Sequence, residues 1–133
     1  MKYLLDTCVL SDYARGDENT LVRLKATPPE LVATTSITVM EVEFGLELNS
    51  VRARKLAPVM HALLDAIEVL HYDSEDARAS ARLRAALSKK GLPIGAYDVL
   101  IAGCALARGL ILVSSNEGEF SRVPGLKLEN WRA

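Results

Sequence analysis

Short apolar runs rich in β-branched residues recur along this chain, and longer segments with helical start and stop signals separate them. Runs of this kind predict buried strands. The expected strands cover residues 2–5, 31–36, 67–70, 110–113 and, as a marginal edge strand, 126–128. Because strands that alternate with helices are typical of βα units, the pattern predicts an α/β protein with a mostly parallel central sheet.

The helices are predicted from the segments between these strands. We expect them over residues 7–15, 21–25, the segment around Glu41 up to Gly45 or Leu48, 51–65, 73–90 and 95–108. Proline disfavours helix in the residue before it, so Pro28 and Pro29 end the second helix. Pro58 falls inside the fourth and could kink or divide it. No repeat, linker or low-complexity tract interrupts the pattern, which predicts a single domain over residues 1–133.

Composition and charge narrow the function only modestly. Half of the 133 residues are apolar, enough for a real core, and the net charge is −1. This charge argues against a non-specific DNA binder, but not against an enzyme that holds phosphate through a metal and a local basic patch. Cys8 and Cys104 lack CxxC spacing, and we expect both to be reduced and buried. Without a signal peptide or a bilayer-spanning stretch, a cytoplasmic protein is expected.

Three isolated carboxylates, Asp6, Glu41 and Asp98, are each expected at a strand-to-helix junction. Parallel sheets bind ligands at the carboxyl ends of their strands, where such junctions meet. Three acids without a basic partner in their motifs would repel one another there unless a cation lay between them. The sequence therefore predicts a divalent metal site.

Each acid also has a purely structural interpretation. Asp6 could be only a helix N-cap. Glu41 shares its helix with Glu43 and Glu47, which lie on one face and are expected in solvent, whereas Glu41 points elsewhere. Asp98 opens a helix that is apolar almost all round, so it is either a first-turn charge favoured by the helix dipole or a ligand at the cleft.

Polar residues elsewhere could complete this site. Thr7 is placed to hydrogen-bond a carboxylate and hold its rotamer. Asn116 and Glu119 follow the strand at 110–113, so they belong to the same sheet edge unless their segment is a simple polar loop. His61 and His71 match no ligand spacing. Hard carboxylate oxygens favour Mg²⁺ or Mn²⁺, and the chemistry that most needs such ions is phosphodiester hydrolysis.

Several motifs, in this order and spacing, resemble those of PIN-domain ribonucleases, specifically the VapC toxins of toxin–antitoxin pairs. They are Leu-Leu-Asp-Thr at 4–7, Ser-Ile-Thr-Val-Met-Glu-Val-Glu-Phe-Gly at 36–45, Arg-Leu-Arg-Ala at 82–85, Gly-Leu-Pro-Ile-Gly-Ala-Tyr-Asp at 91–98, Leu-Val-Ser-Ser-Asn-Glu-Gly-Glu-Phe at 112–120 and Arg-Val-Pro-Gly-Leu-Lys-Leu-Glu-Asn-Trp at 122–131. The resemblance runs nearly end to end. It is specific because the motifs occur together.

The resemblance implies a three-layer α/β/α sandwich and a Mg²⁺- or Mn²⁺-dependent endoribonuclease that cuts structured RNA such as tRNA or rRNA. It also implies a homodimer and inhibition by a cognate VapB antitoxin. By motif, Asp6, Glu41 and Asp98 match the three main acids, Glu119 matches an acid of many relatives, and Asn116 matches a polar residue beside it.

Two positions depart from the family pattern. Cys8 stands where Asn often follows the Asp-Thr pair, and Ser114 with Ser115 replaces Thr-Asn. Both lie beside the expected ligands, so they put metal affinity in question more than the reaction type. They also motivate an alternative, a catalytically silent PIN-like module that binds RNA or protein.

Two further features bear on partners. Local basic residues could flank the cleft and bind RNA or the antitoxin: Arg15, Arg52, Arg54, Lys55, Arg84, Lys89 and Lys90. Apolar residues expected to form the antitoxin groove are Leu46, Leu48, Val59 and Leu63. Other Mg²⁺ phosphotransfer folds fit poorly, because a haloacid-dehalogenase-like enzyme needs an Asp at position 8 and a receiver domain needs a Lys near positions 114–116.

Overall fold

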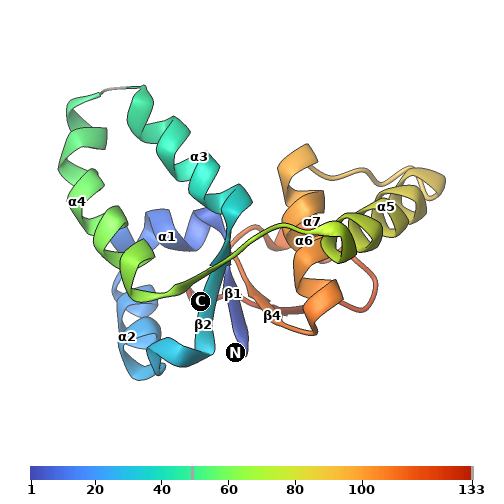
Figure 1. The fold of residues 1–133 in the computed structure, drawn as a ribbon, viewed down its shortest axis with the longest axis horizontal. Helices are drawn as coiled ribbons and strands as arrows, with labels where there is room; N and C mark the ends of the chain where they lie inside the picture. The colour runs from blue at the N-terminus through green and yellow to red at the C-terminus, as the bar shows by residue number, and fades with distance from the viewer. Residues whose placement is uncertain (49, 133) are drawn as a thin grey trace.

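The computed structural model describes residues 1–48 and 50–132, and at its centre is a five-stranded sheet (Figure 1). The strands are β1 (Tyr3–Leu5), β2 (Val32–Thr35), β3 (Glu68–Leu70), β4 (Ile111–Val113) and β5 (Lys127–Glu129). They pair in the order β3-β2-β1-β4-β5, and every pair is parallel. The prediction of five strands and a parallel sheet is confirmed.

Seven α-helices and one short 3₁₀-helix connect the strands within the described residues. They are α1 (Thr7–Ala14), α2 (Glu18–Ala26), the 3₁₀-helix η1 (Pro29–Leu31), α3 (Ser36–Glu47), α4 (Val51–Ala66), α5 (Ser74–Lys89), α6 (Ala96–Arg108) and α7 (Glu117–Phe120). The six predicted helices are present. Neither η1 nor the single turn α7 was predicted: Leu31, the last residue of η1, was expected in a strand, and α7 lies in the segment that could have been a simple polar loop. Pro58 lies inside α4 without dividing it.

Successive strand residues point to opposite faces of the sheet, which builds two separate cores. Leu4, Ala33 and Leu112 pack in a core with side chains from α5 and α6. Leu5 and Val113 pack in a second core with side chains from α1 and α4. Helices therefore cover both faces, and the predicted α/β/α sandwich is confirmed (Figure 1).

The layer formed by α5 and α6 is packed closely. A Cβ atom built on Gly103 of α6 would lie 2.8 Å from the Cα atom of Ser80 in α5, so only glycine allows this approach. The Arg108 guanidinium at the end of α6 also donates to the buried Asp76 carboxylate of α5, at 3.0 Å from Nη2 to Oδ2. These contacts fix the middle and the C-terminal end of α6 against α5.

Chain direction then determines where functional side chains gather. Helices α1 and α3 leave β1 and β2 from the carboxyl ends of those strands. Helix α6 precedes β4 and runs back across the sheet before it, so α6 begins at the same edge. The first turns of all three helices therefore meet at one edge of the sheet.

Candidate metal centre

Asp6 lies directly after β1 and is only 2% exposed. One of its carboxylate oxygens accepts a hydrogen bond of 3.0 Å from the Val9 backbone N–H, which makes Asp6 the N-cap of α1. Burial raises the pKa of Asp6 to about 6, although hydrogen bonds from Ser114 and Val9 act in the opposite direction and the charge of Glu41 adds to the rise. Asp6 is thus a helix cap and also a buried acid whose ionised form is only partly compensated by hydrogen bonds.

Glu41 lies in the second turn of α3 and is half-buried. The Thr7 hydroxyl donates a hydrogen bond of 2.7 Å to its Oε1 atom, so the predicted bond from Thr7 to a carboxylate is present. Glu43 pairs instead with His61, at 2.8 Å between Oε1 and Nε2, and Glu47 is exposed. The predicted difference in direction between Glu41 and its two neighbours is confirmed.

Asp98, Asn116 and Glu119 form a connected group at the start of α6. The Asn116 amide donates to Glu119 Oε2 at 2.7 Å and lies 3.5 Å from Asp98 Oδ2. The Gly95 backbone N–H donates to the other Glu119 oxygen at 3.0 Å. The turn that carries Asn116 is held by Ser114, whose buried hydroxyl accepts from the Asn116 N–H at 3.0 Å.

The two carboxylates in this group titrate as a pair. The pKa of Asp98 is raised to about 7, mainly by burial and in addition by the hydrogen bond with Glu119 and the charges of Glu119, Asp6 and Glu41. Hydrogen bonds from Asn116 and Asp98 lower the pKa of Glu119. The two carboxyl groups therefore do not ionise independently, and Asp98 is the one whose ionisation is disfavoured.

The expectation that every acid lies at a strand-to-helix junction is wrong for two of the three. Asp6 follows a strand directly, but Glu41 is one turn into its helix and Asp98 follows the loop from α5. They approach Asp6 because α3 starts, and α6 also starts, at the carboxyl edge of the sheet. Their proximity is evident electrostatically, since the charges of Asp6 and Glu41 both raise the pKa of Asp98.

The donor set fits a hard divalent cation. None of the ion pairs among the described residues engages Asp6, Glu41, Asp98 or Glu119. Carboxylate and amide oxygens are ligands suited to Mg²⁺ or Mn²⁺. Over residues 1–48 and 50–132, no three His, Cys, Asp or Glu side chains lie together in a group that could hold a metal ion.

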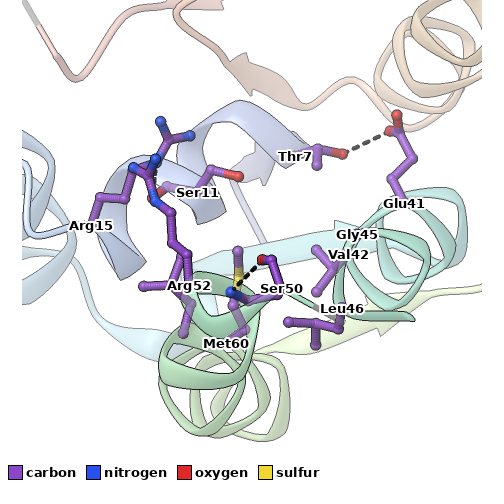
Figure 2. A pocket seen from close by; sticks show the side chains of 12 residues that line it. Thr7, Ser11, Arg15, Glu41, Val42, Gly45, Leu46, Ser50, Arg52 and Met60 are labelled. Carbon is purple, nitrogen blue, oxygen red and sulfur yellow. Dashed lines mark hydrogen bonds between the residues drawn. The ribbon is translucent and has the colours of Figure 1, made fainter. Parts of the chain in front are cut away.

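A cavity of about 310 Å³ lies between α1, α3 and α4, and Glu41 is the one acid of the site that lines it (Figure 2). Thr7 and Glu41 lie at one end of it, and Leu46 lines its wall. The proposed antitoxin groove needs correction here, because Leu63 is buried in the core with α1. Leu48 and Val59 are exposed but do not line the cavity.

One cysteine assignment is also wrong, and some site residues were missed. Cys104 is buried as expected, but Cys8 is exposed, because α1 buries the following residues Val9 and Leu10 instead.

Sequence reasoning did not single out the Gly95 N–H as a donor to Glu119, since a backbone donor carries no sequence signal. Ser11 in the cavity was also missed, although its spacing of four from Thr7 places both on one helix face.

The structure thus defines the class of this protein as a parallel α/β/α sandwich with acidic side chains at the carboxyl edge of its sheet. Residues 3–126 match the family model of the PIN domain. The chain belongs to the PIN domain family. Within the described residues, no helix is both long and apolar enough to cross a membrane.

Relatives and solved structures of matching length agree with this family. The chain is 37% identical to the tRNA(fMet)-specific endonuclease VapC of Salmonella typhimurium, with 98% of each chain covered. It is also 37% identical to ribonuclease VapC2 of Haemophilus influenzae, again over 98% of each. A crystal structure of DNA-bound VapBC from Salmonella typhimurium matches with a TM-score of 0.90 at 35% identity, covering 98% of both chains.

Proposed function

We propose that this chain is a metal-dependent endoribonuclease and the toxin of a VapBC-type toxin–antitoxin pair, acting in the cytoplasm. The observation that carries the proposal is the group of one buried and three half-buried acids at the carboxyl edge of the sheet, where Asp6 and Asp98 have raised pKa values and no ion-pair partner among the described residues. The endonuclease and ribonuclease names of full-length relatives support the same reaction.

The roles of the side chains follow from their contacts. Asp6, Glu41 and Asp98 are the proposed ligands of Mg²⁺ or Mn²⁺, and Glu119 is the acid that exchanges a proton with Asp98. Thr7 holds the rotamer of Glu41. A bound cation of this kind lowers the pKa of an attacking water and offsets charge on the scissile phosphate.

Two polar side chains hold the acids in position through hydrogen bonds. Asn116 fixes Glu119 through the bond of 2.7 Å, and Ser114 fixes the turn that carries Asn116. Ser114 also hydrogen-bonds Asp6, so one serine connects the two sides of the site. The serine that departs from the family pattern therefore still supplies a hydroxyl where the acids need one.

The proposed substrate is a structured RNA, with tRNA the first to test, because one full-length relative is named for tRNA(fMet). The proposed partners are a VapB-type antitoxin and a second copy of the chain, in keeping with the VapBC complexes among similar structures. An apolar stripe on α3 offers a surface for such a protein partner. Met40, Phe44 and Leu48 follow at intervals of four and are 39%, 63% and 68% exposed.

The test is cleavage of total RNA and of tRNA by purified, antitoxin-free protein with Mn²⁺, with Mg²⁺ and with EDTA. We expect discrete, metal-dependent cuts that are lost in Asp98→Asn. Asp65→Asn is the matched control, because Asp65 is an exposed acid on α4 and its loss removes the same charge away from the site. Metal-dependent cleavage by folded Asp98→Asn would overturn the site assignment.

A silent RNA- or protein-binding module is the alternative, and the absence of a closed acid cluster within the described residues is the observation that favours it. The two functions differ in metal binding. If folded wild-type protein neither cleaves RNA nor gains thermal stability from Mn²⁺, the nuclease proposal is wrong and the module remains.

A further inference from the structure

The cavity between α1, α3 and α4 has a basic end as well as an acidic one. Arg15 at the end of α1 and Arg52 in the first turn of α4 both line it, and Figure 2 shows their side chains at the end away from Thr7 and Glu41. Two guanidinium groups from different helices therefore face one hollow, in a chain with a net charge of −1.

These two arginines lie at the cavity without a carboxylate in contact with either guanidinium among the ion pairs of the described residues. Among the described residues, ion pairs engage Arg23, Arg78, Arg108 and Arg132, whereas none engages Arg15 or Arg52. The Nε atom of Arg15 donates to the Ser11 carbonyl oxygen at 3.3 Å, which orients the guanidinium at the cavity. A positioned guanidinium without a carboxylate partner is suited to binding a phosphate with two parallel hydrogen bonds.

A polar stripe connects the two ends of the cavity. Thr7, Ser11 and Arg15 follow at intervals of four on α1, so they lie along one face of that helix, and all three line the cavity. Eight residues of helix correspond to about 12 Å, a length that a few nucleotides of extended RNA cover. On the opposite wall, Gly45 of α3 leaves open space, since a Cβ atom built there meets nothing within 4 Å.

We infer that Arg15 and Arg52 form a phosphate-binding subsite for the substrate RNA, a few nucleotides away from the phosphodiester bond held at the acids. This inference rests on the proposed ribonuclease function and adds a positioning site to it. The charge of the cavity selects the occupant: an RNA strand carries its negative charge continuously and matches both the cation-holding acids at one end and the arginines at the other. Contacts this far from the reacting atoms bind substrate and transition state alike.

The test uses a double variant in which both arginines are replaced, Arg15→Gln with Arg52→Gln. Its control is Arg82→Gln, which removes an exposed arginine on α5 outside the cavity. Binding of fluorescein-labelled bulk tRNA is measured in the Asp98→Asn background between about 50 and 200 mM KCl. Each lost single-strand phosphate contact lowers the salt slope by about 0.7, so the double variant loses about 1.4. Over this fourfold change in salt, its affinity should therefore fall about sevenfold less than that of the parent.

A cleavage readout separates this subsite from the catalytic machinery. In the background with Asp98 intact, the double variant should raise KM for tRNA several-fold and leave kcat nearly unchanged. Ser11→Asp provides a second variant that keeps both arginines, and it should weaken tRNA binding because its carboxylate lies on the proposed path and pairs with Arg15.

Three results would overturn the inference. One is an unchanged salt slope and KM in the double variant while the wild type cleaves RNA, which leaves the ribonuclease proposal standing. Another is normal tRNA binding combined with lost affinity for a VapB-type antitoxin, which makes the cavity a protein-binding site. A third is an equal loss in Arg82→Gln, which makes the effect one of general charge. Failure of the ribonuclease proposal is distinguishable, because the wild type itself would then show no metal-dependent cleavage.

Discussion

Without metal, the Asp98→Asn variant should be more stable than the wild type. With bound metal, the variant should be less stable than the metal-loaded wild type. The raised pKa of Asp98, from 3.8 to about 7, means that ionisation opposes folding. The difference is about 3 pH units, or at most ~4 kcal/mol at ~1.4 kcal/mol for each. Because the side chain is part exposed and water screens its charge, we expect roughly 1–2 kcal/mol.

The sign of the pH dependence follows from the direction of that change. The folded protein holds the Asp98 proton more tightly than the unfolded chain does. The contribution of Asp98 to the free energy of unfolding therefore declines as the pH rises from about 4 through about 7. Asparagine cannot ionise, so the variant lacks this decline and its stability advantage is complete above about pH 7. Part of the slope remains in the variant because the pKa of Asp6 is also raised, to about 6.

These energies correspond to measurable shifts in the unfolding temperature. For 133 residues, an unfolding entropy of ~2.1 cal/mol/K per residue converts 1 kcal/mol into about 3–4 °C. Without metal, Asp98→Asn should therefore melt about 4–7 °C above wild type at pH 7.5. With Mn²⁺ at about 100 times its Kd, the wild type should gain ~2.7 kcal/mol, or about 10 °C, and the variant little.

The assay is thermal unfolding followed by circular dichroism, with EDTA and with Mn²⁺, between about pH 5 and pH 8. Asp65→Asn, with its exposed side chain on α4, should follow the wild type under every condition. The reasoning is refuted if Asp98→Asn melts at or below the wild-type temperature in EDTA. It is also refuted if the variant keeps the full stabilisation by Mn²⁺, since Asp98 would then not be a ligand.

Two further predictions concern support of the site and packing of the fold. Thr7→Val removes the hydrogen bond of 2.7 Å to Glu41 and should weaken Mn²⁺ binding about 10–100-fold, as measured by calorimetry. RNA cleavage by this variant should recover at high Mn²⁺ concentration. An unchanged affinity for Mn²⁺ would show that the bond does not orient Glu41. Gly103→Ala should lower the free energy of unfolding, measured in urea, by about 1–3 kcal/mol, because the added Cβ atom meets Ser80. The control Gly45→Ala should raise it by ~0.5–1 kcal/mol, because its Cβ atom meets open space and alanine favours the helix. Effects of the same sign in both variants would contradict the packing argument.

Contacts between distant parts of the chain account for what sequence reasoning missed. Glu41 and Thr7 are separated by 34 positions, and their hydrogen bond exists only because α1 and α3 leave adjacent strands at the same edge. The exposure of Cys8 and the burial of Leu63 have the same origin. Each depends on which face of a helix meets the sheet, and a local pattern leaves that open for a helix with apolar residues on several sides.

The sequence by itself determined the five strands, the six longer helices and the identities of the acids. These features depend on periodicity, capping and turn residues within a few positions of one another. Only the tertiary structure decided the strand order, the raised pKa of Asp98, and the cavity with Glu41 at one end and arginines at the other. The physical reason is that pKa values and cavities arise from burial and from charges brought together across the chain, and these are set by packing rather than by local conformational preference.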